Sequence, residues 1–129
     1  MCASIWEKFK FDVLIIDYPQ LLNLDEETSH LESIKKIYTS LQDMAQKYNC
    51  ALIAPAQTFK MAQDKPLHDL TSTQCQSISY TSSVVISLNM TDEERASGHM
   101  RLHLAKNRGG IGDKTYPVFI DFEHCRLVP

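Results

Sequence analysis

The first half of the chain carries two short apolar runs separated by one long segment of helical period. The first run covers residues 13–16 and ends at Asp17, and the second covers residues 50–55. A continuous apolar run of this length is typical of a strand buried on both faces, as in a parallel sheet. Apolar side chains recur at helical spacing over residues 31–48. The pattern predicts a βαβ unit, in which a crossover helix joins two parallel strands.

Capping residues define the ends of the predicted helix. Ser29 followed by Glu32 is a capping-box signature for its first turn, and Asn49 is a suitable C-terminal stop. A shorter apolar face of helical spacing lies within residues 5–9. We expect this N-terminal segment to form a short helix that packs beneath the first strand.

The middle of the chain is more polar. Residues 58–82 are rich in Ser, Thr and Gln and show little periodicity, which predicts an exposed loop with room for one short helix. Residues 84–88 form a third apolar run, and we expect a third buried strand there. Thr91 and the acids that follow it predict a short capped turn that closes at Gly98.

Two alternating segments predict a β-hairpin near the C-terminus. Residues 100–106 and 116–122 alternate between apolar and polar side chains, with Leu102 and Leu104 on one face of the first strand. The connecting residues 107–115 are rich in glycine, which suits a tight turn. Residues 125–128 would add a final strand.

The size and composition of the chain indicate one ordinary domain over residues 1–129. Its apolar fraction of 43% and charged fraction of 22% are normal for a soluble globular protein. No apolar stretch has the length of a membrane span, and the N-terminus lacks a signal-peptide pattern. We therefore expect a cytoplasmic protein without a membrane partner. The four cysteines stand apart from one another and are expected to be reduced thiols.

The charge of the chain is unevenly distributed. A formal net charge of −3 argues against a protein that coats nucleic acid. From Arg95 onward, however, basic residues outnumber acidic ones. This basic tail is consistent with an anionic partner and equally with an ordinary solvated face.

Polar side chains follow the two predicted parallel strands. Asp17 comes directly after the first strand, and Gln57 follows the second. The carboxyl ends of parallel strands share one edge of the sheet, where open α/β folds bind ligands. In P-loop nucleotide hydrolases, an acid at this place helps to hold the magnesium of a nucleoside triphosphate. The complementary Gly-Lys-Ser/Thr loop is absent from the sequence, so a nucleotide site here would be incomplete.

The order of these motifs resembles a known motor. A strand ending in Ile16-Asp17-Tyr18, a strand followed by Ala56-Gln57, and a hairpin carrying residues 106–110 (Lys-Asn-Arg-Gly-Gly) occur in that order. From about Phe11 to its end, the chain resembles the C-terminal half of the RecA-like motor domain of DnaB-type replicative helicases, including phage primase-helicases. The resemblance implies an α/β, partial RecA-like P-loop NTPase core plus a C-terminal β-hairpin, lacking the Walker A strand-loop-helix.

The resemblance also implies roles for individual residues. Asp17 matches the Walker B acid, which holds magnesium through water. Gln57 matches the polar residue that senses the γ-phosphate and relays to the DNA-facing loop. Lys106 and Arg108 match the basic pair that reaches into a neighbouring subunit's nucleotide site, where an arginine finger neutralises charge on the transferred phosphoryl group. A finger that acts in trans implies a ring or filament.

The sequence departs from the family pattern in two regions. The phosphate-binding loop, the strand before it and the segment with the catalytic glutamate are missing. Before the third strand, Thr73 and Gln74 replace an Arg and a Glu of many family members. The resemblance brings Thr73, Gln74 and Gln76 near single-stranded DNA, where hydroxyls and backbone amides can contact phosphates.

These observations predict part of an ATP-dependent replicative DNA helicase motor. The chain alone should not hydrolyse ATP, and it would use ATP and Mg²⁺ only after a Walker A-bearing segment or partner completes the site. Two alternatives are a non-catalytic RecA-like scaffold and a fragment of a recombinase-type ATPase. Without partners, Asp17 could simply end a strand, and Lys106 and Arg108 could form a solvated hairpin tip. A sheet that lacks strands exposes an apolar edge, which predicts an oligomer.

Overall fold

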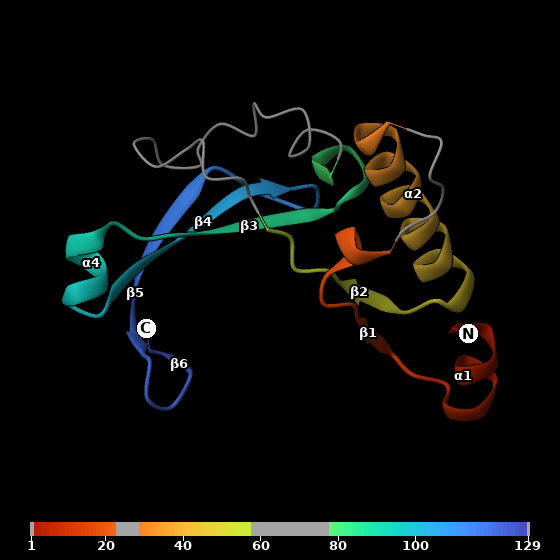
Figure 1. The fold of residues 1–129 in the computed structure, drawn as a ribbon, viewed down its shortest axis with the longest axis horizontal. Helices are drawn as coiled ribbons and strands as arrows, with labels where there is room; N and C mark the ends of the chain where they lie inside the picture. The colour runs from red at the N-terminus through yellow and green to blue at the C-terminus, as the bar shows by residue number, and fades with distance from the viewer. Residues whose placement is uncertain (1, 23–28, 58–77, 129) are drawn as a thin grey trace. The chain divides into compact units, whose positions relative to one another are not determined.

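The computed structural model describes residues 2–22, 29–57 and 78–128 of an α/β chain. It contains two compact units (Figure 1). The first unit holds the described residues up to 57 together with residues 78–81, and the second holds residues 82–128.

The first unit is built on a parallel pair of strands. Its elements are α1 (Cys2–Phe9), β1 (Val13–Ile15), the 3-10 helix η1 (Pro19–Leu21), α2 (His30–Tyr48) and β2 (Ala51–Ile53). Strands β1 and β2 pair in parallel, with Val13 opposite Ala51 and Ile15 opposite Ile53. Because α2 connects them, the predicted βαβ unit is confirmed.

Local capping fixes the ends of α2 as the sequence predicts. The Ser29 hydroxyl accepts a hydrogen bond from the Glu32 N–H at 3.4 Å. Asn49 ends the helix in the left-handed conformation, with φ of 48°, which asparagine tolerates better than most residues.

The core of the first unit lies between α2 and one face of the strand pair (Figure 1). The buried side chains are aliphatic or aromatic residues of α2 at helical spacing: Ile34, Ile37, Tyr38 and Leu41. Partly buried residues of β2, of the segments after β1 and β2, of α2 itself and of the helical residues 78–81 pack against this cluster: Ile16, Met44, Leu52, Ala54 and Ile78. Helix α2 therefore supplies most of the buried apolar surface of this unit.

The prediction that the first two strands are buried on both faces is wrong for the face opposite α2. Val13, Ile15 and Ile53 are 49%, 62% and 52% exposed. Successive side chains of a strand point to opposite faces. Helix α2 covers the face of Leu14 and Leu52, and no described element buries the other face.

Helix α1 contacts the C-terminal end of α2. Trp6 stacks on Tyr48 with ring centroids 5.0 Å apart. The Lys10 ammonium lies 3.6 Å from the Trp6 ring centroid, a cation–π contact. Ile5 and Phe9 are exposed, so the expectation that this apolar face packs beneath the first strand is wrong for these two side chains.

The second unit is an antiparallel sheet with one short helix. Its elements are β3 (Val84–Asn89), α4 (Asp92–Ala96), β4 (His99–Asn107), β5 (Lys114–Asp121) and β6 (Arg126–Val128). The strand order is β3-β4-β5-β6, and every neighbouring pair is antiparallel. The predicted hairpin and final strand are confirmed.

Strand β3 differs from the buried strand that its apolar sequence predicts. It pairs antiparallel with β4 at the edge of the second sheet. Val84, Ile86 and Leu88 are exposed, because no described element packs on their face of the sheet. Residues 78–81, just before β3, are helical. This agrees with the sequence-based expectation of a loop over residues 58–82 that has room for one short helix.

A capped turn joins β3 to β4. Thr91 and Glu94 form a reciprocal capping box at the start of α4. The Glu94 carboxylate also binds Arg101 of β4, with Nε 2.8 Å from Oε1 and Nη2 3.0 Å from Oε2. Gly98 follows with φ of 70°, a backbone conformation that favours glycine. The predicted capped turn that closes at Gly98 is confirmed.

None of the described helices is both long and apolar enough to cross a membrane.

Candidate functional site

Asp17 and Gln57 follow the two parallel strands of the first unit. The Ile16 N–H donates to the Ile53 carbonyl at 3.0 Å, so strand pairing continues to the residue before Asp17. Gln57 lies in the segment 54–57 that leaves β2. Both side chains are exposed. Because β1 and β2 are parallel, both residues lie beyond the carboxyl end of the sheet, where open α/β folds bind ligands.

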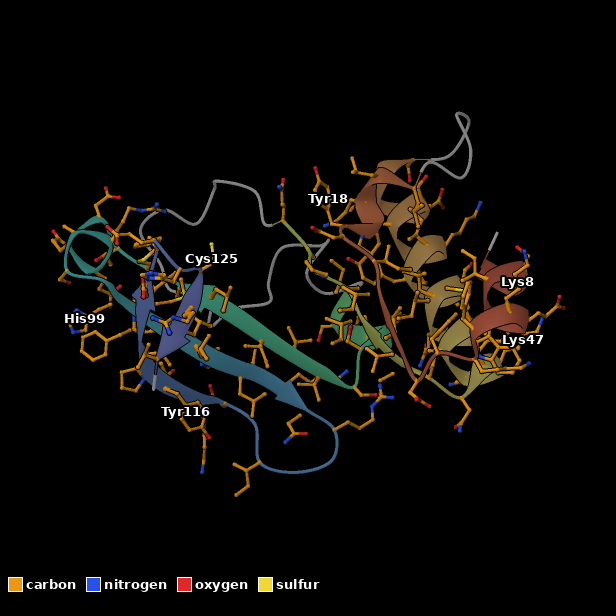
Figure 2. The ribbon with its side chains drawn as sticks, turned by 90° about the horizontal axis from the view of Figure 1, so that it is seen from below. Lys8, Tyr18, Lys47, His99, Tyr116 and Cys125 are labelled. Atoms are coloured by element: carbon orange, nitrogen blue, oxygen red, sulfur yellow. The ribbon has the colours of Figure 1, made fainter. Side chains whose placement is uncertain are left out.

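The chain turns away from the sheet directly after Asp17. Tyr18, labelled in Figure 2, precedes η1 and has an extended backbone. Pro19, the first residue of η1, is fully buried, and η1 packs against α2. The strand thus ends at Asp17, and the chain enters a buried turn that leaves the carboxylate exposed.

The donor groups at this edge match the coordination that magnesium prefers in nucleotide sites. Magnesium keeps several waters and is usually held by one or two carboxylates together with substrate phosphates. Asp17 offers one exposed carboxylate, with which no described residue forms an ion pair. Clusters of three or more His, Cys, Asp or Glu are absent from the described part of the chain. These residues fit magnesium held through water and phosphate, and do not fit an all-protein metal cage.

Lys106 and Arg108 lie at the tip of the hairpin in the second unit. Lys106 is a half-buried residue of β4 and pairs with Val85 of β3. Arg108 follows the end of β4 with an exposed side chain, and its N–H donates to the Ser83 carbonyl at 2.8 Å. The ladder between β3 and β4 shifts register between Val85 and Ile86, next to this tip. Backbone pairing with the segment before β3 therefore holds the base of the Arg108 side chain.

Asn107, which sequence reasoning did not select, organises the same tip. Its Oδ1 accepts a hydrogen bond from the Gly109 N–H at 3.2 Å, and its Nδ2 donates to the Ile111 carbonyl at 3.3 Å. The side chain therefore holds two points of the turn on either side of Gly110. The sequence did contain a signal for this role. An asparagine just before glycines at a turn can form a hydrogen bond from its side chain to the backbone two residues further along.

His103 is the second residue that the alternating pattern did not reveal. It is 2% exposed, and its Nδ1 lies 3.0 Å from the Thr115 hydroxyl. Its Nε2 lies 3.6 Å from Asp113 Oδ1 in the turn. The sequence pattern directed attention to Leu102 and Leu104, which are only half-buried. A buried histidine between two leucines has no signature in the alternation of apolar residues.

The described groups with a shifted pKa serve the fold. Burial raises the pKa of the Tyr38 hydroxyl to about 12. A hydrogen bond from the Thr91 backbone lowers the pKa of Glu94, with a further contribution from Arg101. A hydrogen bond from Arg126 and another from His124 lower the pKa of Asp121. Shifted pKa values often mark functional sites, but these groups belong to the α2 core, a helix cap and a turn.

Four of the predicted site residues lie in described segments. Asp17 and Gln57 belong to the first unit, and Lys106 and Arg108 belong to the second. Thr73, Gln74 and Gln76, predicted near DNA, fall outside the described residues.

Solved structures share this fold. The ATPase domain of one DnaB-like helicase superposes with a TM-score of 0.81 at 22% sequence identity, covering 98% of this chain and 49% of that chain. A second DnaB-like replicative helicase, solved in a study of its interactions with primase, gives a TM-score of 0.80 at 19% identity, covering 98% of this chain and 34% of that chain. No protein-family profile and no curated protein sequence matches the chain.

The likeness to these two structures extends over almost the whole chain. The chain therefore has the α/β fold of part of a DnaB-like helicase ATPase domain, which confirms the partial RecA-like core expected from the sequence. It spans about half of the first structure and a third of the second.

Proposed function

We propose that this chain is a portion of a DnaB-like, ATP-dependent replicative DNA helicase motor. In this proposal residues 1–129 form one partial domain, and a further segment or a partner supplies the Gly-Lys-Ser/Thr loop. The motor works in the cytoplasm as a ring on single-stranded DNA. The observation that carries the proposal is the position of Asp17 at the carboxyl edge of two parallel strands, in a fold shared with helicase ATPase domains.

Asp17 and Gln57 serve the nucleotide that this chain helps to bind. The Asp17 carboxylate would hold a magnesium ion through water, and the metal would supply positive charge that favours phosphoryl transfer. The Gln57 amide, beyond the neighbouring strand, contacts the γ-phosphate. Loss of that phosphate on hydrolysis removes the contact and releases the segment after β2.

Lys106 and Arg108 serve the nucleotide of a neighbouring subunit. Charge develops on the oxygens of the γ-phosphoryl group as its bond to the β-phosphate oxygen breaks and water attacks. A planar guanidinium that stays protonated at all working pH values can neutralise this charge with two hydrogen bonds. Arg108 leaves the sheet with an exposed side chain on a hydrogen-bonded backbone, which suits this role.

Thr73, Gln74 and Gln76 are the proposed contacts to single-stranded DNA. Their hydroxyl and amide groups suit phosphate and sugar contacts that carry no sequence information. Binding by such neutral groups would depend less steeply on salt than binding by several lysines or arginines, because fewer counterions are released.

The first experiment is native mass spectrometry of the tagged chain recovered from its own host. We expect a stoichiometric partner that carries a Gly-Lys-Ser/Thr loop, and magnesium-dependent ATP hydrolysis by the assembly but not by the pure chain. Asp17→Asn should lower kcat of the assembly at least about 100-fold, since a metal contributes several kcal/mol to charge stabilisation. Asp12→Asn is the matched control, because Asp12 is also exposed and precedes the same strand at its opposite end.

A mixing experiment tests whether Arg108 acts in trans. Arg108→Ala should lower kcat on the order of 1000-fold, as for other arginine fingers. Arg95→Ala, at an exposed arginine of α4, is the control. Mixed rings of Asp17→Asn and Arg108→Ala subunits should regain hydrolysis at interfaces that combine the two intact residues. Mixed rings without activity would contradict the proposal that Arg108 acts on the nucleotide of a neighbouring subunit. ATP turnover by the pure chain would contradict the proposal that its own nucleotide site is incomplete.

The second candidate is a non-catalytic RecA-like scaffold. The sequence lacks the phosphate-binding loop, and the strand face of Val13, Ile15 and Ile53, which no described element covers, is suited to contact another protein. This function predicts that Lys106→Ala and Arg108→Ala leave the role of the protein in the cell unchanged. Loss of cellular function in either variant would exclude it.

A further inference from the structure

We infer that Asn107 is a positioning residue for Arg108. Its side chain holds the hairpin tip in one conformation, so that the arginine leaves the sheet in one direction. The inference rests on the proposed function, in which Arg108 contacts the nucleotide of a neighbouring subunit.

The Asn107 side chain bonds to the turn on both sides of its centre. Its amide oxygen accepts from the Gly109 N–H at 3.2 Å, and its amide nitrogen donates to the Ile111 carbonyl at 3.3 Å. The backbone of Asn107 adds a third bond to the same turn, because its carbonyl accepts a hydrogen bond from the Gly110 N–H at 3.4 Å. A short side-chain amide suits this arrangement, because its oxygen accepts and its nitrogen donates at two separate atoms, and Gln is one methylene longer.

Arg108 lies between fixed neighbours. Lys106 before it belongs to the β3–β4 ladder, and the Arg108 N–H itself donates to the Ser83 carbonyl at 2.8 Å. The residue after it, Gly109, donates its N–H to Asn107. Hydrogen bonds therefore fix the backbone before, at and after Arg108. The one after it, at Gly109, is the bond that the Asn107 side chain accepts.

The glycines of the tip are packed around Asn107. A Cβ on Gly110 would lie 3.3 Å from Asn107 Nδ2, and one on Gly112 would lie 3.4 Å from the Asn107 backbone nitrogen. A larger side chain at either position would displace one of the Asn107 contacts or require the turn to shift. The glycine-rich composition of the turn thus follows in part from the space that Asn107 and its backbone occupy.

Below the tip, a further bond closes the hairpin. The Asp113 N–H donates to the Leu104 carbonyl at 2.7 Å, with Asp113 in the left-handed region at φ of 55°. Loss of the Asn107 side chain should therefore loosen residues 108–111 without opening the strands. This separation makes it possible to distinguish positioning of Arg108 from general stability.

The first test uses the ¹⁵N-labelled chain and nuclear magnetic resonance. In Asn107→Ala, the order parameter of Gly109 should fall from about 0.85 to below about 0.6, the change from a rigid to a flexible backbone on the C-terminal side of Arg108. Asn89→Ala is the matched control, because Asn89 is also hydrogen-bonded in this sheet but lies at the other end of β3. An unchanged order parameter at Gly109 in Asn107→Ala would overturn the inference.

The second test uses the ATP-hydrolysing assembly. Asn107→Ala should lower kcat about 10- to 100-fold with little change in KM for ATP, because a displacement of about 1 Å is enough for such a loss. Asn89→Ala should keep the wild-type rate. Rings that mix Asn107→Ala with Asp17→Asn should recover activity, whereas rings that mix Asn107→Ala with Arg108→Ala should not.

The two tests separate the inference from the proposed function. An assembly that hydrolyses ATP equally well with Asn107→Ala overturns the positioning role and leaves the proposed function intact. A wild-type assembly without hydrolysis overturns the proposed function and, with it, the catalytic purpose of the positioning. The order parameter of Gly109 then still decides whether Asn107 holds the backbone on the C-terminal side of Arg108.

Discussion

The two units of the molecule stabilise their strands in different ways. In the first unit, two strands of three residues each pair in parallel, and a helix of 19 residues covers one of their faces. In the second unit, four antiparallel strands pair in chain order with short connections. The first unit depends on side-chain packing by a crossover helix, while the second depends on its backbone ladder and its turns.

This difference shows where each unit is vulnerable. The buried aliphatic side chains of the first unit are concentrated on α2, so a single truncation there removes a large share of its core. In the second unit, the buried residues include the polar Asn89 and His103 together with Met100 and Val118. Among the described residues of this unit, the buried side chains are therefore polar as often as apolar, unlike those of the first unit.

The largest expected effect is in the α2 core. Leu41→Ala should lower the free energy of unfolding of the first unit by about 2–5 kcal/mol, because Leu41 is 5% exposed and its loss leaves a cavity. Urea unfolding followed by fluorescence of Trp6, the single tryptophan, measures this unit. The control Leu21→Ala, at an η1 leucine of the same unit that is 67% exposed, should cost less than about 0.5 kcal/mol. Equal costs for the two leucines would refute the comparison.

A smaller effect is expected at the turn before β4. Gly98→Ala should destabilise the second unit by about 1–2 kcal/mol, because φ of 70° is unfavourable for a residue with a Cβ. Amide hydrogen exchange at Met100 and Val118 measures the change. Gly109→Ala is the control, since the added Cβ would be no nearer than 3.8 Å to the Asn107 side chain. Faster exchange in the control than in Gly98→Ala would contradict the assignment of strain to φ.

The smallest effect is expected at the turn between β5 and β6. The hydrogen bond from Arg126, followed by that from His124, lowers the pKa of Asp121 in the folded chain. The ionised form is therefore favoured by folding, and its contribution is complete above the unfolded pKa and is lost as the pH falls through the folded pKa. The protection factors of amide exchange in residues 121–128, which compare each rate with its intrinsic value at the same pH, should fall over this acidic range. In Asp121→Asn this fall should disappear, and its persistence would assign it to another group.

Features that depend on local residues could be predicted from the sequence. The ends of α2 follow from Ser29 and Asn49, and the hairpin follows from alternation on both sides of a glycine-rich turn. Asp17 was selected because an acid directly after an apolar run marks the end of a strand. Each of these signals lies within a few positions of the feature it predicts.

Features that depend on what covers a surface could not be predicted. The apolar runs of β1 and β3 predict burial on both faces, but Ile15 and Ile86 are exposed. The prediction fails because apolar composition does not specify which element, if any, covers each face. The role of Asn107 depends on the course of the backbone through Gly109 and Ile111, which sequence spacing does not give. His103 is buried through contacts with Thr115 and Asp113, on the next strand and in the turn.

Strand β4 has a mechanical consequence. Its nine residues span roughly 30 Å at about 3.3 Å per residue, and residues 101–104 are paired on both edges, by β3 and by β5. At one end, Arg101 joins it to α4 through Glu94, and at the other it continues into Arg108. A strand bonded along both edges resists bending, so β4 should be stiffest over residues 101–104. Bending should concentrate between these residues and Arg108, where only β3 pairs with the strand and the ladder shifts register.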